Sequence, residues 1–217
     1  MMRLEFPRKS ERPLTILCLG SHSDDIEIGC GGTIMRLAKD HPDTMIYWTV
    51  FSAIGVREAE AEQGAKLFAG SCLKSAPMLK KFKDGFMPYS GAEVKTVFEE
   101  ELKHISPDIV FTHNRKDAHQ DHRLLSELTW NTFRNHLILE YEIPKYDGDM
   151  GQPSIFVQLE TDLCHRKTKY LLETFKSQHT KPWFQQDTFL SLMRLRGMEC
   201  NAPSGYAEAF YCHKLLL

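Results

Sequence analysis

Hydrophobic runs of strand length alternate along this chain with stretches of helical periodicity. Strands are expected at 15–19, 45–51 and 109–112, with a weaker one at 71–79, and helices at 32–39, 57–68, 91–105 and from Asp121 onward. Alternation of this kind predicts βα units around a largely parallel sheet.

The pattern is less regular beyond Asn135. Strands are expected at 136–143, 155–159 and 209–213, and helices at 163–175 and 188–198, with a polar loop at 144–153. No repeat, low-complexity segment or linker divides the chain. We therefore expect a single Rossmann-like α/β domain over residues 1–217, with a mostly parallel sheet flanked by helices.

Composition narrows the class of protein. The chain has 217 residues, 42% of them hydrophobic, which suits one sizeable domain. Its 27 basic and 29 acidic side chains nearly cancel, so charge gives no argument for nucleic acid as a partner. The first 13 residues lack the apolar core of a signal peptide, and no run approaches the roughly 20 apolar residues of a membrane span. We expect a cytoplasmic protein, and its oligomeric state stays open.

The six cysteines are scattered and form no C-x-x-C pair. Together with the missing secretory signal, this spacing predicts reduced thiols and argues against a cysteine zinc site.

A first chemical cluster, His22-Ser23-Asp24-Asp25, follows the strand at 15–19 and precedes a glycine-rich stretch at 29–32 that we expect to open the next helix. Ligands bind at the carboxyl ends of strands in open α/β sheets. One imidazole and two carboxylates supply two ligands and a base for a hydrolytic metal site. The alternative is that the two aspartates only cap the helix.

A second cluster, residues 117–123, follows the strand at 109–112. If the strands before the two clusters are neighbours in a parallel sheet, both clusters leave the same edge. His119 and His122 are three positions apart, which puts both imidazoles on one face of a helical turn. His22, Asp25 and His122 would then form a zinc site with a position left for water. A solvated helix start is the simpler interpretation of the two histidines.

Other polar residues are assigned less directly. Arg57 could hold a phosphate or sugar hydroxyls, or it could form a salt bridge with Glu58 or Glu60 at the start of a helix. His113 is interpreted as a satisfied loop residue, and the alternative is a place behind the metal ligands. Five further histidines are expected at the surface: His41, His104, His136, His165 and His179.

The two clusters resemble known motifs. The first, with Gly29-Cys30-Gly31-Gly32-Thr33, resembles the His-Pro-Asp-Asp motif and glycine turn of the PIG-L-like deacetylases, zinc hydrolases that act on N-acetylglucosamine-type amino sugars. His119-Gln120-Asp121-His122 resembles the family's His-x-Asp-His motif. Similarity extends from Leu14 to the C-terminus, through the segments 57–60 and 206–210.

The resemblance implies a role for each matching residue. His22, Asp25 and His122 would bind Zn²⁺, Asp24 would be the general base, and His119, in its protonated form, would face the reacting carbonyl. Asp121 would orient His119 or His122 as a carboxylate behind the ligands. Asp84 would accept hydrogen bonds from sugar hydroxyls, although a plain turn residue is the alternative. Ser23 replaces the family's proline, so a less rigid loop is expected.

These assignments predict a zinc-dependent N-deacetylase that releases acetate and a free amine from an N-acetylated amino sugar. One alternative is an amide hydrolase of a thiol-conjugated or nucleotide-linked amino sugar. Another is a non-catalytic Rossmann-like binding module, which is disfavoured because no G-x-G-x-x-G follows the first strand. No motif identifies the group attached to the sugar.

Overall fold

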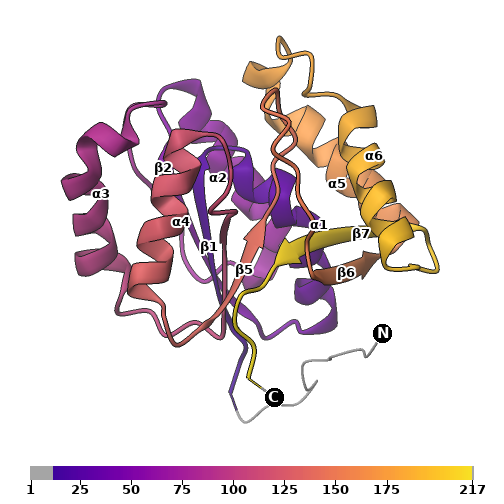
Figure 1. Cartoon of the computed structure of the whole chain (residues 1–217), viewed down its shortest axis with the longest axis horizontal. Coiled ribbons are helices and arrows are strands. Elements are labelled where there is room, and N and C mark those ends of the chain that lie inside the picture. Colours follow the sequence, from indigo (N-terminus) through magenta and orange to yellow (C-terminus); the bar gives the residue numbers. More distant parts are fainter. Residues whose placement is uncertain (1–11, 217) are drawn as a thin grey trace.

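A seven-stranded sheet forms the centre of the protein (Figure 1), seen in a computed structural model that describes residues 12–216. The strands lie in the order β3-β2-β1-β4-β5-β7-β6. They are β1 (Thr15–His22), β2 (Met45–Ser52), β3 (Met78–Leu79), β4 (Ile109–His113), β5 (Leu137–Tyr141), β6 (Ile155–Leu159) and β7 (Tyr206–Tyr211). The pairs from β3 to β5 are parallel, and β7 is antiparallel to β5 and β6. The expected single, mostly parallel α/β fold is confirmed. Residues 1–11, within the stretch predicted to lack a signal peptide, lie outside the described residues.

Helices cover both faces of this sheet (Figure 1). They are α1 (Asp25–Asp40), α2 (Val56–Ala69), α3 (Gly91–Val97), α4 (Gln120–Thr132), α5 (Thr161–Thr174) and α6 (Gln186–Glu199). Alternate residues of β1 enter two different cores, Ile16 with α1, α2 and α5, and Leu17 with α3 and α4. A central strand buried on both faces needs the continuous apolar run that predicted it. In the described part of the chain, no helix combines the length and apolar character needed to cross a membrane.

The pairing of β1 with β4 places the two polar clusters at one sheet edge. β1 lies between β2 and β4, and Cys18 is in register with Phe111. The sheet grows from β1 in both directions, so the loops after β1 and β4 diverge and leave a crevice for a ligand. The condition set by the sequence analysis, that these strands are parallel neighbours, is confirmed.

Glycines lie inside helix α1 and do not open it, which corrects the expected helix start near Gly32. A Cβ atom on Gly29 would lie 2.2 Å from the Tyr141 ring, and one on Gly31 would lie 2.5 Å from the Phe68 ring. The glycines let α1 approach β5 and α2 more closely than any other residue would. Their low helix propensity is outweighed by this packing.

Three other boundaries differ from expectation. The weak strand at 71–79 is a 3₁₀ turn, η1 (Gly70–Cys72), followed by the two-residue β3, because Pro77 has no N–H to donate to a ladder. The helix expected at 91–105 becomes a wider π turn, η3 (Phe98–Leu102), after Val97. The last strand starts at Tyr206 and ends at Tyr211, where pairing with β6 and β5 sets its limits.

A buried ion pair, Lys167 with Glu208, holds the middle of α1. The Glu208 carboxylate accepts hydrogen bonds from the amides of Gly32 and Thr33 at 2.8 and 2.6 Å. The Lys167 ammonium donates to Glu208 and to the carbonyl of Ile28, both at 2.6 Å. These bonds connect α5 and β7 to the helix that begins at Asp25.

Removing one partner of this pair is expected to destabilise the protein strongly. Glu208→Ala leaves the Lys167 ammonium buried and unpaired, a change that costs about 3–5 kcal/mol. The free energy of unfolding in urea measures the loss. Glu62→Ala, which breaks the exposed pair with Lys66, is the control and should cost less than about 1 kcal/mol. Equal losses in the two variants would contradict the role given to Glu208.

Candidate metal centre and active site

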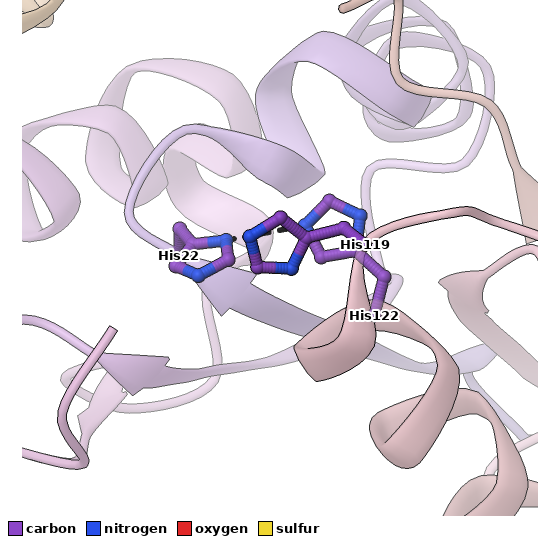
Figure 2. Close-up of side chains that lie close together, drawn as sticks. All are labelled: His22, His119 and His122. Atoms are coloured by element: carbon purple, nitrogen blue, oxygen red, sulfur yellow. Dashed lines mark hydrogen bonds between the residues drawn. The ribbon is translucent and has the colours of Figure 1, made fainter. Parts of the chain in front are cut away.

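Three side chains at the end of β1 and the start of α4 bring their ligand atoms into one triangle. His22 is the last residue of β1, Asp25 the first of α1, and His122 lies in the first turn of α4. His22 Nδ1 is 3.1 Å from His122 Nε2 and 3.3 Å from Asp25 Oδ2. His122 Nε2 is 3.5 Å from Asp25 Oδ2. Figure 2 shows the imidazoles of His22 and His122 facing each other, with His119 beside them. The triangle contains the three predicted metal ligands.

The size of this triangle matches a tetrahedral zinc site. Zinc bonds to nitrogen and oxygen are about 2.0–2.2 Å long, so two tetrahedral ligand atoms lie about 3.3–3.6 Å apart. Two of the observed separations, 3.3 and 3.5 Å, fall in this range, and the third, 3.1 Å, is slightly shorter. Two imidazoles and one carboxylate are also a donor set that zinc uses in hydrolytic sites, where the fourth position stays open.

His122 is held in place by Asp117, which the sequence analysis left without a role. Asp117 Oδ2 lies 2.9 Å from His122 Nδ1, while its other oxygen is paired with Lys145 at 3.0 Å. Burial and the nearby His113 lower the pKa of His122 to about 3, despite the opposing effect of Asp25 and Asp117. The imidazole is therefore neutral, and its Nε2 lone pair points to the triangle. A carboxylate behind a ligating histidine fixes the ring and raises its basicity.

Asp24 occupies the N-cap position of α1, as the simpler interpretation expected, but its side chain makes no capping hydrogen bond. Asp24 Oδ1 instead accepts a 2.5 Å hydrogen bond from Arg57 Nη2, and both side chains are largely buried. Arg57 also approaches Glu60 at 3.9 Å, whereas Glu58 pairs with Lys81. Arg57 thus orients the predicted base, and its contact with substrate stays a prediction.

His119 is the N-cap residue of α4. Its Nδ1 accepts a hydrogen bond from the Asp121 amide at 3.3 Å, so Nε2 carries the proton of the neutral ring. Burial and the charge on His22 lower the pKa of His119. The ring centroid lies 4.9 Å from that of His22 and 4.5 Å from that of His122. A neutral His119 can therefore donate a hydrogen bond beside the metal triangle.

Asp121 contacts a different histidine from the two that the sequence suggested. Its Oδ2 lies 3.3 Å from His22 Nε2, and the carboxylate also accepts hydrogen bonds from the amides of Gly85 and Met87. Asp121 contacts His22 because its side chain, in the first turn of α4, points toward the loop after β3. Asp121 lies behind His22 as Asp117 lies behind His122.

Asp84 lies at the open side of His22. Its Oδ1 is 2.9 Å from His22 Nε2, and the side chain is 72% exposed. The hydrogen bond with His22 lowers the pKa of Asp84 to about 2, against the effect of partial burial. Burial opposes a charge on His22, but Asp25, Asp121 and Asp84 together outweigh it, so the pKa of His22 is well above its ordinary value. A bound cation would take the place of that proton.

His113 belongs to the site, which the sequence analysis considered only as the less favoured interpretation. It is the last residue of β4, fully buried, and its Nε2 lies 3.2 Å from Asp25 Oδ2. Its ring stacks on His122 with centroids 3.8 Å apart. The signal was its position at the carboxyl end of a buried strand next to β1. The five histidines expected at the surface are exposed or half-buried.

Ser23 of the first cluster and the nearby Glu27 have structural roles. Ser23 is buried, and its hydroxyl lies 3.5 Å from the carbonyl oxygen of Ser52, which ties the loop to the end of β2. Glu27 points to α2, where a Cβ atom on Gly64 would lie 2.2 Å from its Oε1. Burial raises the pKa of Glu27 well above its ordinary value. Neither residue belongs to the metal triangle.

Comparison with known proteins decides the family. Residues 17–133, more than half of the chain, match the PIG-L family, described as GlcNAc-PI de-N-acetylase. The chain belongs to the PIG-L family. The matched region of this PIG-L protein contains both clusters, and the chain is accordingly a hydrolytic N-deacetylase.

Solved structures with the same fold include N,N'-diacetylchitobiose deacetylase from Pyrococcus horikoshii, with 20% identity and a TM-score of 0.69 over 92% of this PIG-L chain and 83% of that chain. The zinc-inhibited form of teicoplanin deacetylase Orf2 has 13% identity and a TM-score of 0.69, over 91% of this chain and 97% of that chain. GalB, the 4-carboxy-2-hydroxymuconate hydratase from Pseudomonas putida KT2440, has 14% identity and a TM-score of 0.72, over 94% of this chain and 98% of that chain. At these identities the likeness shows the fold alone, and a hydratase shares it.

Asp117→Asn should weaken metal binding by this PIG-L protein about 10–100-fold, because the amide holds His122 less firmly and lowers its basicity. Competition with a chromogenic chelator measures the zinc dissociation constant. Asp147→Asn, an exposed substitution on the other side of Lys145, is the matched control and should leave the constant unchanged. An unchanged constant in Asp117→Asn would show that Asp117 does not support the ligand.

Proposed function

We propose that the protein removes the N-acetyl group from an N-acetylglucosamine-type amino sugar or its conjugate, using zinc held by His22, Asp25 and His122. The triangle of donor atoms, 3.1–3.5 Å on a side, carries this proposal. Asp24 directly precedes the ligand Asp25 in sequence and is oriented by Arg57. The family supports the reaction type, and the names of the diacetylchitobiose and teicoplanin deacetylases support an acetylated sugar as substrate.

Asp24 moves the proton in the proposed reaction. Zinc, when bound, supplies an activated water at neutral pH and polarises the acetamide carbonyl. Arg57 holds Oδ1 of Asp24, which leaves Oδ2 to accept the proton of the attacking water. Asp24 then returns this proton to the leaving nitrogen as the amide C–N bond breaks. The products are acetate and the free amine of the sugar.

His119 stabilises the charge that develops on the acetamide oxygen. Its Nδ1 is used in capping α4, so the Nε2–H group is the donor that faces the reacting carbonyl. A neutral ring serves this purpose. The protonated His119 that the sequence led us to expect is disfavoured, because burial and the charge on His22 lower the pKa of His119. One such donor is worth about 3 kcal/mol of transition-state stabilisation.

Asp84 is the group that we assign to the sugar ring. Its carboxylate is exposed at the edge of the metal triangle and fixed by His22, so it can accept hydrogen bonds from ring hydroxyls while the acetamide faces His119. This assignment leaves the group attached to the sugar open. Hydrolysis of a thiol-conjugated or nucleotide-linked amino sugar would use the same residues.

Asp24→Asn should keep the metal and lose turnover. An amide cannot accept the proton of the attacking water, and loss of a general base costs about 10²–10⁴ in rate. Metal analysis should still find about one zinc per chain, while acetate release from N-acetylglucosamine conjugates is measured by an enzyme-coupled assay. Full activity in Asp24→Asn would contradict the role of Asp24 as the general base.

Removal of the metal tests zinc itself. A chelator should abolish acetate release, and readdition of about one equivalent of zinc should restore it, because three protein ligands support one tight site. His122→Ala should show no recovery at that concentration. Activity that survives complete chelation would exclude a metal-dependent hydrolase.

A further inference from the structure

His22 has carboxylates on both sides of its ring. Its Nδ1 belongs to the metal triangle, while Nε2 on the opposite side is 2.9 Å from Asp84 and 3.3 Å from Asp121. Ligand atoms of His22, Asp84, His119 and Asp121 all lie within 4.8 Å of one another. We call these four residues the outer cluster. None of its atoms other than those of His22 takes part in the triangle.

We propose that the outer cluster is a second, weaker zinc site whose occupation inhibits the enzyme. Binding of a second ion is a property of these residues alone, whereas inhibition rests on the deacetylase function proposed above.

Charge favours a cation at this place. The other acids around the triangle have permanent partners, Asp24 with Arg57 and Asp117 with Lys145. Within residues 12–216, the ion pairs of Asp84 and Asp121 are with His22 alone. An imidazole that binds a metal is a neutral ligand. Once zinc occupies the triangle, the two carboxylates about His22 Nε2 have no ion-pair partner within residues 12–216, and Lys181 acts on Asp84 only from beyond ion-pair distance.

The donor types suit zinc, but several features make the outer cluster the weaker site. Asp84, Asp121 and His119 would supply two carboxylates and one imidazole nitrogen, which are zinc ligands, while a metal-bound His22 keeps the proton on its Nε2. Asp121 already accepts two backbone hydrogen bonds, and His119 would have to give up a proton or its capping bond. Asp84 is mostly exposed, so water competes for its oxygens. The triangle, which is buried and of the right size, should fill first.

Inhibition follows from which residues the second ion would take. His119 is the proposed donor to the acetamide oxygen, and Asp84 is the proposed contact with the sugar. An ion held by both would remove these contacts and occupy the space beside the triangle. Activity should therefore rise with the first equivalent of zinc and fall as the second site fills.

Calorimetric titration of zinc into the metal-free protein tests the site, with acetate release followed over the same range. The wild-type protein should show a tight binding event and a weaker one, with loss of activity following the weaker event. Asp84→Asn should weaken the second event about 10-fold or more and reduce inhibition by the same factor, expressed relative to the variant's own rate at one equivalent. Asp187→Asn, an exposed substitution on α6, is the matched control and should behave as the wild type.

The outcomes separate the two proposals. A single binding event in the wild type, or a second event unchanged in both Asp84→Asn and Asp121→Asn, would overturn the outer cluster as a zinc site. A second event that leaves activity unaffected would overturn its inhibitory role. Absence of deacetylase activity at every zinc concentration would instead contradict the proposed function, while calorimetry would still decide whether the second site exists.

Discussion

The parallel pairing of β1 with β4 is the constraint on which the rest of the site depends. It brings His22 and His122, 100 positions apart, to 3.1 Å. Neither cluster could form a metal site alone, because the first supplies one imidazole and the second lacks Asp25. Because both strands are buried on both faces, their register is set by the two hydrophobic cores, and the site inherits the rigidity of the sheet.

Electrostatics explains why the site needs a cation. Asp25 lies among three imidazoles, and burial opposes every charge in this group, yet the histidines hold the pKa of Asp25 well below its ordinary value. Each of three surrounding charged residues contacts one member of the site: Arg57 orients Asp24, Asp117 holds His122 and Asp121 holds His22. Without a metal, His22 supplies the positive charge by keeping its proton. A divalent ion would provide the positive charge in place of that proton, together with a position for the substrate.

The elements predicted from the sequence were most accurate where one physical effect dominated. Apolar runs located the central strands because strands buried on both faces leave no polar alternative. Predictions failed where a distant partner decides the outcome. The glycines of α1 looked like a turn until Tyr141 and Phe68 were found packed against them. His113 looked like a loop residue because nothing nearby in sequence shows that it lies under Asp25.

The sequence by itself determined the fold class, the family and the identity of the candidate ligands, since strand periodicity and two short motifs are local properties of the chain. Only the tertiary structure decided which carboxylate supports which histidine, that Arg57 turns to Asp24, and that His22 faces acids on both sides. These are contacts between residues far apart in sequence. Their geometry depends on strand order, helix approach and burial, which no local pattern encodes.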